Sequence, residues 1–347
     1  MTVIDWFALR TSLKRAAPAL ALYTILLILY FAVPGKSQLI AQILFYAVLG
    51  QAFNIFMGMT GYVDFGYVAF LAAGAYGFSI AILLLSGVGG GWMFIPLGLL
   101  IAAIIAASLA GLVGAIALRL RGAYFAIATI GVNEGLRYLV EGLNILGGSI
   151  GLYIVKDMKE LVGREGYQLA ATTLADMLMF LLAGVAVLTT SLILSTRMGF
   201  ALQAIREDED AARALGINVT KYKIAAFMIS GVLGGALGAL NWALKGGVVE
   251  PAQVFLILYT VEAIVIVMLG GAGTLLGPIF GALIYIGLNF TSNVYIAPVL
   301  ESAGIKATGL HLIILAPILL AVIIAAPQGL VGAIRSRAPS RLREIVV

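Results

Sequence analysis

The stretch FGYVAFLAAGAYGFSIAILLLSGVGGGWMFIPLGLLIAAIIAASLAGLVGAIAL, from Phe65 to Leu118, decides the fold. It contains no charged residue, and a glycine triplet, Gly89-Gly90-Gly91, divides it in two. A helix that spans a bilayer needs about 20 apolar residues, so each side of the triplet is long enough to cross a membrane once. The stretch therefore predicts two consecutive transmembrane helices.

The whole chain has the same apolar character. Of its 347 residues, 62% are apolar and 11% are charged, whereas soluble domains are about half apolar and about a quarter charged. It has no cysteine, and His311 is its one histidine, which excludes thiol catalysis, thiolate metal sites and multi-histidine metal or haem sites. The net charge of +5 does not indicate a nucleic-acid partner, because membrane proteins collect basic residues in their cytoplasmic loops.

Ten apolar stretches have the length of a transmembrane helix. They are residues 16–33, 37–58, 63–86, 92–118, 122–143, 171–196, 224–244, 254–270, 277–298 and 309–326. Basic residues precede the first stretch as in a signal peptide, but its small-residue triplets lie at its start, which indicates a retained helix. The predicted fold class is an all-α integral membrane protein with about ten transmembrane helices.

The basic residues predict the orientation. With the N-terminus inside, the inside loops hold 14 of them: Arg10, Lys14, Arg15, Arg119, Arg121, Arg197, Arg206, Arg213, Lys221, Lys223, Arg335, Arg337, Arg341 and Arg343. The outside loops hold 6: Lys36, Lys156, Lys159, Arg164, Lys245 and Lys306. Because basic residues favour the cytoplasmic side, we expect both termini in the cytoplasm.

The predicted organisation is one transmembrane domain over residues 1–347. Its parts are a first helix set at 16–143, an external loop at 144–170, a second helix set at 171–326, a cytoplasmic loop at 197–223 and a cytoplasmic basic tail at 327–347. Five helices in each set predict an inverted repeat, in which the two halves run antiparallel. A weak echo supports the repeat: Asn54 precedes Asp64 as Asn241 precedes Glu250, with glycines between each pair.

The cytoplasmic loop STRMGFALQAIREDEDAARALGINVTKYK, Ser195 to Lys223, contains an acidic run followed by alanines. Acidic residues suit a helix N-terminus, alanine and leucine favour helix, and Gly216 ends it. We therefore expect a short amphipathic helix over 206–216, outside the membrane. It is either a solvated connector or a docking helix for a cytoplasmic partner.

In the docking interpretation, the small and apolar side chains of this helix enter a groove on the partner. The coupling residues are Arg206, Glu207, Asp210, Ala211, Ala212, Arg213, Leu215 and Gly216. Ala211, Ala212, Leu215 and Gly216 fill the groove, Arg213 lies at its rim, and Glu209 stays in solvent. The chain has no glycine-rich loop ending in Gly-Lys-Ser or Gly-Lys-Thr, so any ATP hydrolysis must occur on another subunit.

Several polar residues fall within the predicted spans. A charge inside a spanning helix is costly and faces a cavity or a partner. The pathway candidates are Asn54, Asp64, Tyr67, Glu134, Arg137 and Glu262. Glu134 and Arg137 lie three residues apart on one helical face, so they either pair with each other or line the pathway.

The segment GGAGTLLGPIFGA, Gly270 to Ala282, interrupts an apolar region. The helix-breaking residues are Gly270, Gly271, Gly273, Gly277 and Pro278. Non-helical backbone at membrane depth is tolerated only against protein or water, so this break is either a tight joint between helices or part of a gate.

Six segments in order resemble the permease subunits of branched-chain amino-acid ABC importers of the LivM type. They are MTGYVDFGYVAFLAAGAY (Met59–Tyr76), LRLRGAYFAIATIGVNEGLR (Leu118–Arg137), LGGSIGL (Leu146–Leu152), AIREDEDAARALGIN (Ala204–Asn218), GGAGTLLGPIFGA (Gly270–Ala282) and APQGLVG (Ala326–Gly332). The resemblance covers residues 45–335. The family usually carries a small polar residue where Asp64 stands and often histidine where Tyr67 stands, which leaves the substrate open among amino acids, urea, short amides and aromatic acids.

This resemblance implies a multi-pass permease of the bacterial cytoplasmic (inner) membrane that moves small amino acids inward, most simply branched-chain ones. The implied partners are a second homologous permease, two cytoplasmic ATP-binding subunits and an extracytoplasmic solute-binding protein. No cofactor, metal or catalytic residue is implied. The alternative is an ion- or proton-coupled secondary transporter of a small solute, with Asp64, Glu134 or Glu262 as the coupling carboxylate. A membrane enzyme is disfavoured, because the sequence offers no nucleophile–base or metal cluster.

Overall fold

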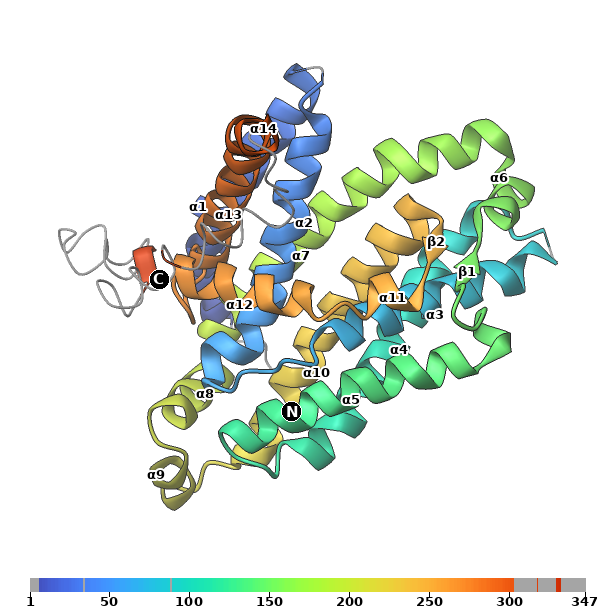
Figure 1. Cartoon of the computed structure of the whole chain (residues 1–347). Coiled ribbons are helices and arrows are strands. Elements are labelled where there is room, and N and C mark those ends of the chain that lie inside the picture. Colours follow the sequence, from blue (N-terminus) through green and yellow to red (C-terminus); the bar gives the residue numbers. More distant parts are fainter. Residues whose placement is uncertain (1–5, 34, 88, 303–316, 318–328, 332–347) are drawn as a thin grey trace.

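The structure is a computed structural model, and it describes residues 6–33, 35–87, 89–302, 317 and 329–331. Helices make up almost all of its regular structure (Figure 1). In the first part of the chain they are α1 (Trp6–Ala32), α2 (Ser37–Phe53), η1 (Asn54–Gly58), α3 (Val68–Ser86), η2 (Gly91–Met93), α4 (Phe94–Ala117), α5 (Ala123–Gly142), η3 (Asn144–Leu146), α6 (Val155–Leu169), η4 (Ala170–Leu174) and α7 (Ala175–Leu194). The later helices are α8 (Arg197–Glu207), α9 (Glu209–Ala214), α10 (Val219–Gly238), η5 (Ala239–Gly246), α11 (Pro251–Val254), α12 (Leu258–Gly270), α13 (Gly277–Thr291), η6 (Ser292–Ile296) and α14 (Ala297–Ser302).

The chain is an all-α membrane protein. Eight helical segments of the described residues are long and apolar enough to cross a membrane: Arg10–Ala32, Ser37–Gly58, Val68–Ser86, Gly91–Ala117, Val155–Leu194, Val219–Gly246, Pro251–Gly270 and Gly277–Val299. They coincide with eight of the ten predicted stretches. The predicted stretch 122–143 is also helical, as α5, but it carries Glu134, Arg137 and Glu141. The predicted stretch 309–326 and the basic tail 327–347 lie outside the described residues, apart from Pro317 and Gly329–Val331.

The predicted external loop at 144–170 is partly helical. α6 occupies Val155–Leu169 and turns at Gly163, whose φ is +76°. It continues through η4 into α7 as one long helical segment (Figure 1). Charged residues such as Lys156 and Glu160 face outward along α6. Because these residues make the segment polar, we predicted a loop here.

The core forms where α3, α4 and α10 pack side by side. Glycines on α3 and α10 allow the close approach of these helices. A Cβ at Gly74 of α3 would lie 1.9 Å from the carbonyl oxygen of Gly235 on α10, and one at Gly238 would lie 2.0 Å from the carbonyl oxygen of Leu71. α2 runs through the middle of the bundle and contacts α7, α10, α12 and α13.

The connections between helices gather at two ends of the bundle. At one end, the segments at 59–67, 118–122, 195–218 and 271–276 contact one another. At the other, β1 (Leu152–Tyr153) pairs antiparallel with β2 (Val248–Val249). In Figure 1, α8 and α9 lie at the lower left and the two strands at the right. The first end thus brings together four segments that the sequence predicts inside, and the strand pair brings together two that it predicts outside.

Within the described residues, four of the long helices contain a π-helical turn, η1, η4, η5 and η6. Asn54 lies in η1 at the end of α2, and Asn241 lies in η5 at the end of α10. These two asparagines form the weak sequence echo, and α2 and α10 are each the second predicted spanning helix of their set. The shared π-helical turn agrees with an inverted repeat, which stays a prediction.

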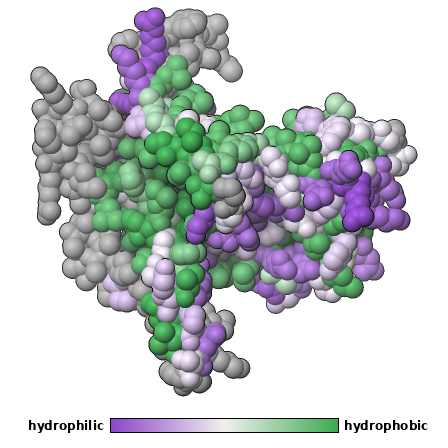
Figure 2. Space-filling view, turned by 90° about the horizontal axis from the view of Figure 1, so that it is seen from above, coloured by the Kyte–Doolittle hydropathy of each residue, from purple (hydrophilic) through white to green (hydrophobic). Residues whose placement is uncertain are grey.

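The surface matches a membrane environment. Large apolar side chains are exposed along α1 and α4, including Ile28, Phe31, Leu112 and Ile116. Figure 2 shows hydrophobic residues over the middle of one face, with hydrophilic residues gathered towards the right, where β1, β2 and α6 lie. The apolar side chains have no partner in the described chain, so lipid or another membrane subunit must cover them.

Candidate functional site

The predicted docking helix over 206–216 is in fact two helices. α8 ends at Glu207, and α9 starts at Glu209. Asp208 between them is extended, with φ −155° and ψ 110°, and its side chain accepts hydrogen bonds from the backbone N–H groups of Asp210 and Ala211, both at 2.9 Å. The prediction of one helix was wrong because Asp208 caps a new helix instead of continuing the first. Arg206 and Glu207 therefore belong to α8.

Ala212 does not face a partner. It is 2% exposed and packs with Ile205 and Val219 in a small core of its own chain. The prediction that Ala212 enters a partner's groove was therefore wrong. The exposed small and apolar residues of this segment are Ala211, Ala214, Leu215 and Gly216, and Leu215 is 82% exposed. Gly216 follows with φ +84°, as expected of a glycine that ends a helix.

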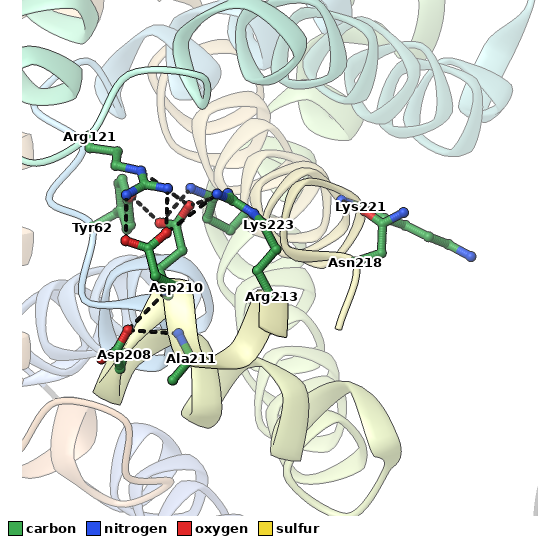
Figure 3. Close-up of polar contacts among 10 residues, drawn as sticks. Tyr62, Arg121, Asp208, Asp210, Ala211, Arg213, Asn218, Lys221 and Lys223 are labelled. Carbon is green, nitrogen blue, oxygen red and sulfur yellow. Dashed lines mark hydrogen bonds and ion pairs between the residues drawn. The ribbon is translucent and has the colours of Figure 1, made fainter. Parts of the chain in front are cut away.

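Glu209 contacts four side chains of a charged cluster. Figure 3 labels these four, Tyr62, Arg121, Arg213 and Lys223. The Glu209 carboxylate accepts hydrogen bonds from the hydroxyl of Tyr62 and, at 3.2 Å, from Lys223 Nζ. Arg213 Nη2 approaches at 3.0 Å and Arg121 Nε at 3.7 Å. The expectation that Glu209 stays in solvent was wrong. This carboxylate joins α9 to α10, to the segment before α3 and to the segment before α5.

A second ion pair reinforces this cluster. The guanidinium of Arg121 donates two hydrogen bonds to the Asp210 carboxylate, at 2.9 and 2.8 Å. The hydrogen bonds and charge of Arg121 lower the pKa of Asp210. Burial alone would raise the pKa of Glu209, but the hydrogen bonds from Tyr62 and Lys223 and the nearby positive charges lower it overall. Both carboxylates are therefore ionised at neutral pH and hold α9 to the bundle.

Arg206, the predicted coupling residue at the end of α8, reaches into the bundle. Its Nη1 donates a hydrogen bond to the carbonyl oxygen of Gly58 at 2.6 Å and a second to that of Ala272 at 3.2 Å. Gly58 ends the π-helical turn η1, and Ala272 lies in the glycine-rich segment after α12. Arg206 thus connects α8 to η1 and to the α12–α13 connection.

The glycine-rich segment forms a tight connection between α12 and α13. Gly271 and Gly273 have φ of +127° and +79°, which other residues rarely adopt. A Cβ at Gly270 would lie 1.8 Å from the carbonyl oxygen of Gly277, and Pro278 stands in the first turn of α13. Of the two interpretations of this break, the geometry favours the joint between helices.

Asn54 closes this joint from α2. Its side-chain oxygen accepts from the N–H of Gly273 at 2.8 Å, and its amide donates to the carbonyl oxygen of Thr274 at 2.9 Å. Asn54 is fully buried. It was expected in the pathway, but in this structure it satisfies two backbone groups of the non-helical segment, as a membrane interior requires.

Asp64 and Tyr67 lie inside the bundle, at the start of α3. Asp64 is 1% exposed, and its Oδ1 accepts from the backbone N–H of Gly66 at 2.8 Å. Tyr67 is equally buried and donates to the carbonyl oxygen of Ser230 on α10 at 2.9 Å. In this conformation the two residues hold the entry of α3 against the core.

Glu262 lies in a different place, in the middle of α12. It is 4% exposed and accepts a 2.6 Å hydrogen bond from the hydroxyl of Tyr285 on α13. Glu134 and Arg137 lie elsewhere again, on α5, where they approach to 3.6 Å, and Arg137 also reaches Glu141 at 3.4 Å. The pathway candidates are thus spread over several places and do not form one cluster.

The stretch 197–216, which contains α8 and α9, is called the coupling segment below. Sequence reasoning missed Tyr62, Arg121 and Lys223 as its partners. Tyr62 lies 147 residues from Glu209, and Arg121 lies 89 residues from Asp210. No local pattern reveals contacts over such separations. The available signal for Arg121 was its place in RGAYF, which is part of one of the segments that carry the family resemblance.

Residues 36–326 match the family described as the branched-chain amino acid transport system / permease component. The chain belongs to this family. The matched residues include most of the helices described above, α8 and α9, and the glycine-rich joint.

Several curated relatives agree with the family. The chain is 32% identical over 274 residues to the high-affinity branched-chain amino acid transport permease LivM of Salmonella typhimurium, and 31% identical over 273 residues to LivM of Escherichia coli K12. Each match covers 73% of this chain but 62% of LivM, so the chain spans about three fifths of the length of these relatives. The permease LivH of Escherichia coli K12 is 26% identical over 83% of this chain and 91% of LivH. No solved structure matches the chain.

Proposed function

We propose that this protein is the membrane-spanning permease subunit of an ATP-driven importer that moves branched-chain amino acids into the cell. The family and the LivM and LivH relatives support this class of transport. The observation that carries the proposal is the coupling segment, because α8 and α9 are fixed by charged contacts to several helix ends while Leu215 stays exposed. Such a segment can receive a motion from a cytoplasmic subunit and pass it to the bundle.

The proposed coupling runs through two connections. A partner ATPase contacts the exposed residues Ala211, Leu215 and Gly216 and moves α9. Glu209 and Asp210 pass the motion to the segments before α3 and α5 through Tyr62 and Arg121. Arg206 passes it to α2 and to the α12–α13 joint. Each step is a short, charge-assisted contact, and such contacts are among the stronger hydrogen bonds in proteins.

A second, homologous permease is the proposed partner within the membrane. α5 carries Glu134, Arg137 and Glu141, with 37%, 29% and 26% of their side chains exposed. The same helix contains Gly131 and Gly135, where an added Cβ would meet nothing within 4 Å. Charged side chains do not face lipid, and glycines four apart allow a second helix to approach closely. The sides of α5 that are not buried in its own chain therefore fit a protein partner or a water-filled pathway between two permeases.

The proposed orientation places both termini and the coupling segment in the cytoplasm of a bacterium, and β1 and β2 outside. The counts of basic loop residues support it. A solute-binding protein would then dock at the strand end.

The chain has no native cysteine, so single cysteines can test the orientation. Ser149→Cys should react with a membrane-impermeant thiol reagent in intact cells, and Gln203→Cys should react only after permeabilisation; the opposite result refutes the orientation.

Reconstituted transport tests the function itself. The chain is placed in proteoliposomes with the permease, ATPases and binding protein encoded beside it, and labelled leucine uptake is measured. We expect uptake that requires ATP on the side of the coupling segment and persists when ion and proton gradients are collapsed. Uptake that follows an imposed proton gradient without ATP would instead support the secondary transporter, with Asp64, Glu134 or Glu262 as the coupling carboxylate.

A further inference from the structure

A polar cavity of about 410 Å³ lies between α2, α7, η5, α12 and α13. One face of α2 lines it from Gln38, in the first turn, to Tyr46. These residues are eight apart, so the cavity extends about 12 Å along the helix at 1.5 Å per residue. It therefore starts at the end of α2 that the orientation places outside and reaches towards the middle of the bundle. None of the coupling or joint residues described above lines it.

One wall of the cavity carries a fixed positive charge. Lys245, at the end of η5, lines the cavity and is 31% exposed, and it also pairs with Asp176. Asp176 lies behind it, 8% exposed, and also accepts a 2.9 Å hydrogen bond from Tyr30. A lysine ammonium has three donors, and this ion pair uses one. Lys245 is thus held in place with donors left for an anionic group in the cavity.

The remaining polar lining supplies both donors and acceptors. Four side-chain amides, those of Gln38, Gln42, Asn241 and Asn289, face the cavity. Each amide can donate to a carboxylate and accept from an ammonium. The lining residues in the described chain thus provide one cation and neutral groups, which suits a ligand that carries both charges.

The inner end of the cavity offers acceptors. Tyr46 and Tyr259 line it, and the Tyr46 ring lies 5.0 Å from the ring of Tyr285. Tyr285 donates to the buried carboxyl group of Glu262, at 2.6 Å. The pathway candidate Glu262 therefore lies directly behind the inner end. An ammonium group is favoured here by the tyrosine hydroxyls and by the carboxyl group behind them.

Phe45, Met179 and Ile286 form the apolar part of the lining. We propose that this cavity binds a free aliphatic α-amino acid as its zwitterion, with the carboxylate on Lys245, the ammonium at Tyr46 and Tyr259, and the side chain against these three apolar residues. The proposal rests on the proposed function and adds a solute site within the permease itself. Selectivity would then be checked twice, by the binding protein and by this cavity.

Protection of a single cysteine tests the site without any partner subunit. Gln42 is exposed in the cavity, and the chain has no native cysteine. The full chain with Gln42→Cys is placed in lipid nanodiscs and labelled with a small thiol reagent while leucine is titrated to tens of millimolar. We expect leucine to slow labelling severalfold. Leucine amide, which lacks the carboxylate, and 4-methylpentanoate, which lacks the ammonium, should give no protection.

A charge-balanced variant tests the assigned residues. Lys245→Met with Asp176→Asn removes both members of the ion pair, so no charge is left unpaired inside the bundle. It should raise the leucine concentration for half-protection by about tenfold or more, as loss of a charge-assisted contact predicts. Lys156→Met, an exposed lysine on α6 with 86% of its side chain exposed, is the control and should leave the protection unchanged.

The outcomes separate this proposal from the proposed function. Unchanged labelling at every leucine concentration, or equal protection by leucine amide, overturns the site even if ATP-driven leucine uptake is intact. Protection by a nucleoside in place of leucine also overturns it, an outcome of interest because the nucleoside permease NupC of Lactococcus lactis is 27% identical over 54% of this chain. Leucine-specific protection that the double variant weakens supports the site even if uptake does not depend on ATP.

Discussion

Arg206 donates a 2.6 Å hydrogen bond to the carbonyl oxygen of Gly58, and through it α8 contacts η1, the π-helical turn that follows α2. In a π-helical turn the hydrogen bonds span five residues, so the regular helical pattern is locally altered. The Gly58 carbonyl thus accepts from a charged donor at the point where η1 ends. The same guanidinium reaches Ala272, so a displacement of α8 acts on two membrane helices at once.

Replacing Arg206 should uncouple the transporter. Arg206→Met removes both hydrogen bonds to backbone carbonyls but leaves the exposed surface of α9 intact. We expect the variant to fold and retain the ATPase, while leucine uptake per ATP hydrolysed falls at least severalfold. Arg197→Met is the matched control, because Arg197 is exposed on the same helix and has no ion-pair partner among the described residues. Normal uptake by Arg206→Met would refute the role of this contact.

Glu209 should contribute strongly to the stability of the end of the bundle that holds α8 and α9. Glu209→Gln leaves Lys223, which is 2% exposed, without its carboxylate partner. We expect a loss on the order of 2 kcal/mol in unfolding free energy, because an unpaired buried charge is costly. Thermal unfolding of the purified chain measures it. Glu207→Gln, two residues away on an exposed carboxylate, should change the midpoint little, and equal midpoints for both variants would contradict the cluster.

The contribution of Glu209 should depend on pH in one direction. Its pKa is lowered in the folded protein by Tyr62, Lys223 and the nearby arginines, which outweigh the effect of burial. Its stabilisation is therefore present above the ordinary carboxyl pKa of about 4.3 and is lost as pH falls through the lowered value. The difference in melting temperature between wild type and Glu209→Gln should be constant from about pH 6 to about pH 8 and should shrink below about pH 4. A difference that grows on acidification would exclude this explanation.

Leu215 should be the main apolar contact with the ATPase. Leu215→Glu places a charge on the exposed surface of the segment, and a charge at a packed interface position costs several kcal/mol of binding. We expect a folded membrane protein that no longer co-purifies with the ATPase. Thr220→Glu, also exposed but in the first turn of α10, is the control. If Leu215→Glu keeps both the ATPase and normal uptake, this surface does not dock.

The charges of α5 should act at the partner interface. Arg137 contacts both Glu134 and Glu141, so Glu134→Gln alone leaves it one carboxylate and should permit folding. Arg137→Met leaves two carboxylates without a cation in the membrane and should reduce the yield of the two-permease complex. Combining it with Glu134→Gln and Glu141→Gln should recover that yield. Co-purification of a tagged second permease measures it, and an unaffected yield with Arg137→Met would argue against α5 as the interface.

The long helices could be predicted from the sequence because lipid requires continuous apolar stretches, and α3 and α4 follow the uncharged stretch at 65–118 closely. The family could also be predicted, since the resembling segments lie in order along the chain. α6 could not be predicted as a helix, because it packs on one side only and its other residues are largely charged, which is typical of a loop. Met158 is its fully buried residue.

The local shape of the coupling segment was harder to predict. Asp208 looks like one more acid in a run, yet it is the residue that caps α9. The burial of Ala212 depends on Ile205 and Val219, one from each neighbouring helix. The partners of Glu209 come from segments far apart in the chain. Helix capping and small cores depend on how the chain turns, and a turn of one residue is not visible in an apolar pattern.

The two ends of the bundle are held by chemically different contacts, and dissolved salt should therefore act on them unequally. The strand end is held by the backbone pairing of Leu152 with Val249 and of Tyr153 with Val248, which ionic strength barely affects. The opposite end depends on ion pairs, and the exposed pair of Arg121 with Asp210 is open to screening. Since the screening length falls from about 8 Å in physiological salt to about 3 Å at 1 M, concentrated salt should loosen the coupling end first and leave the strand end closed.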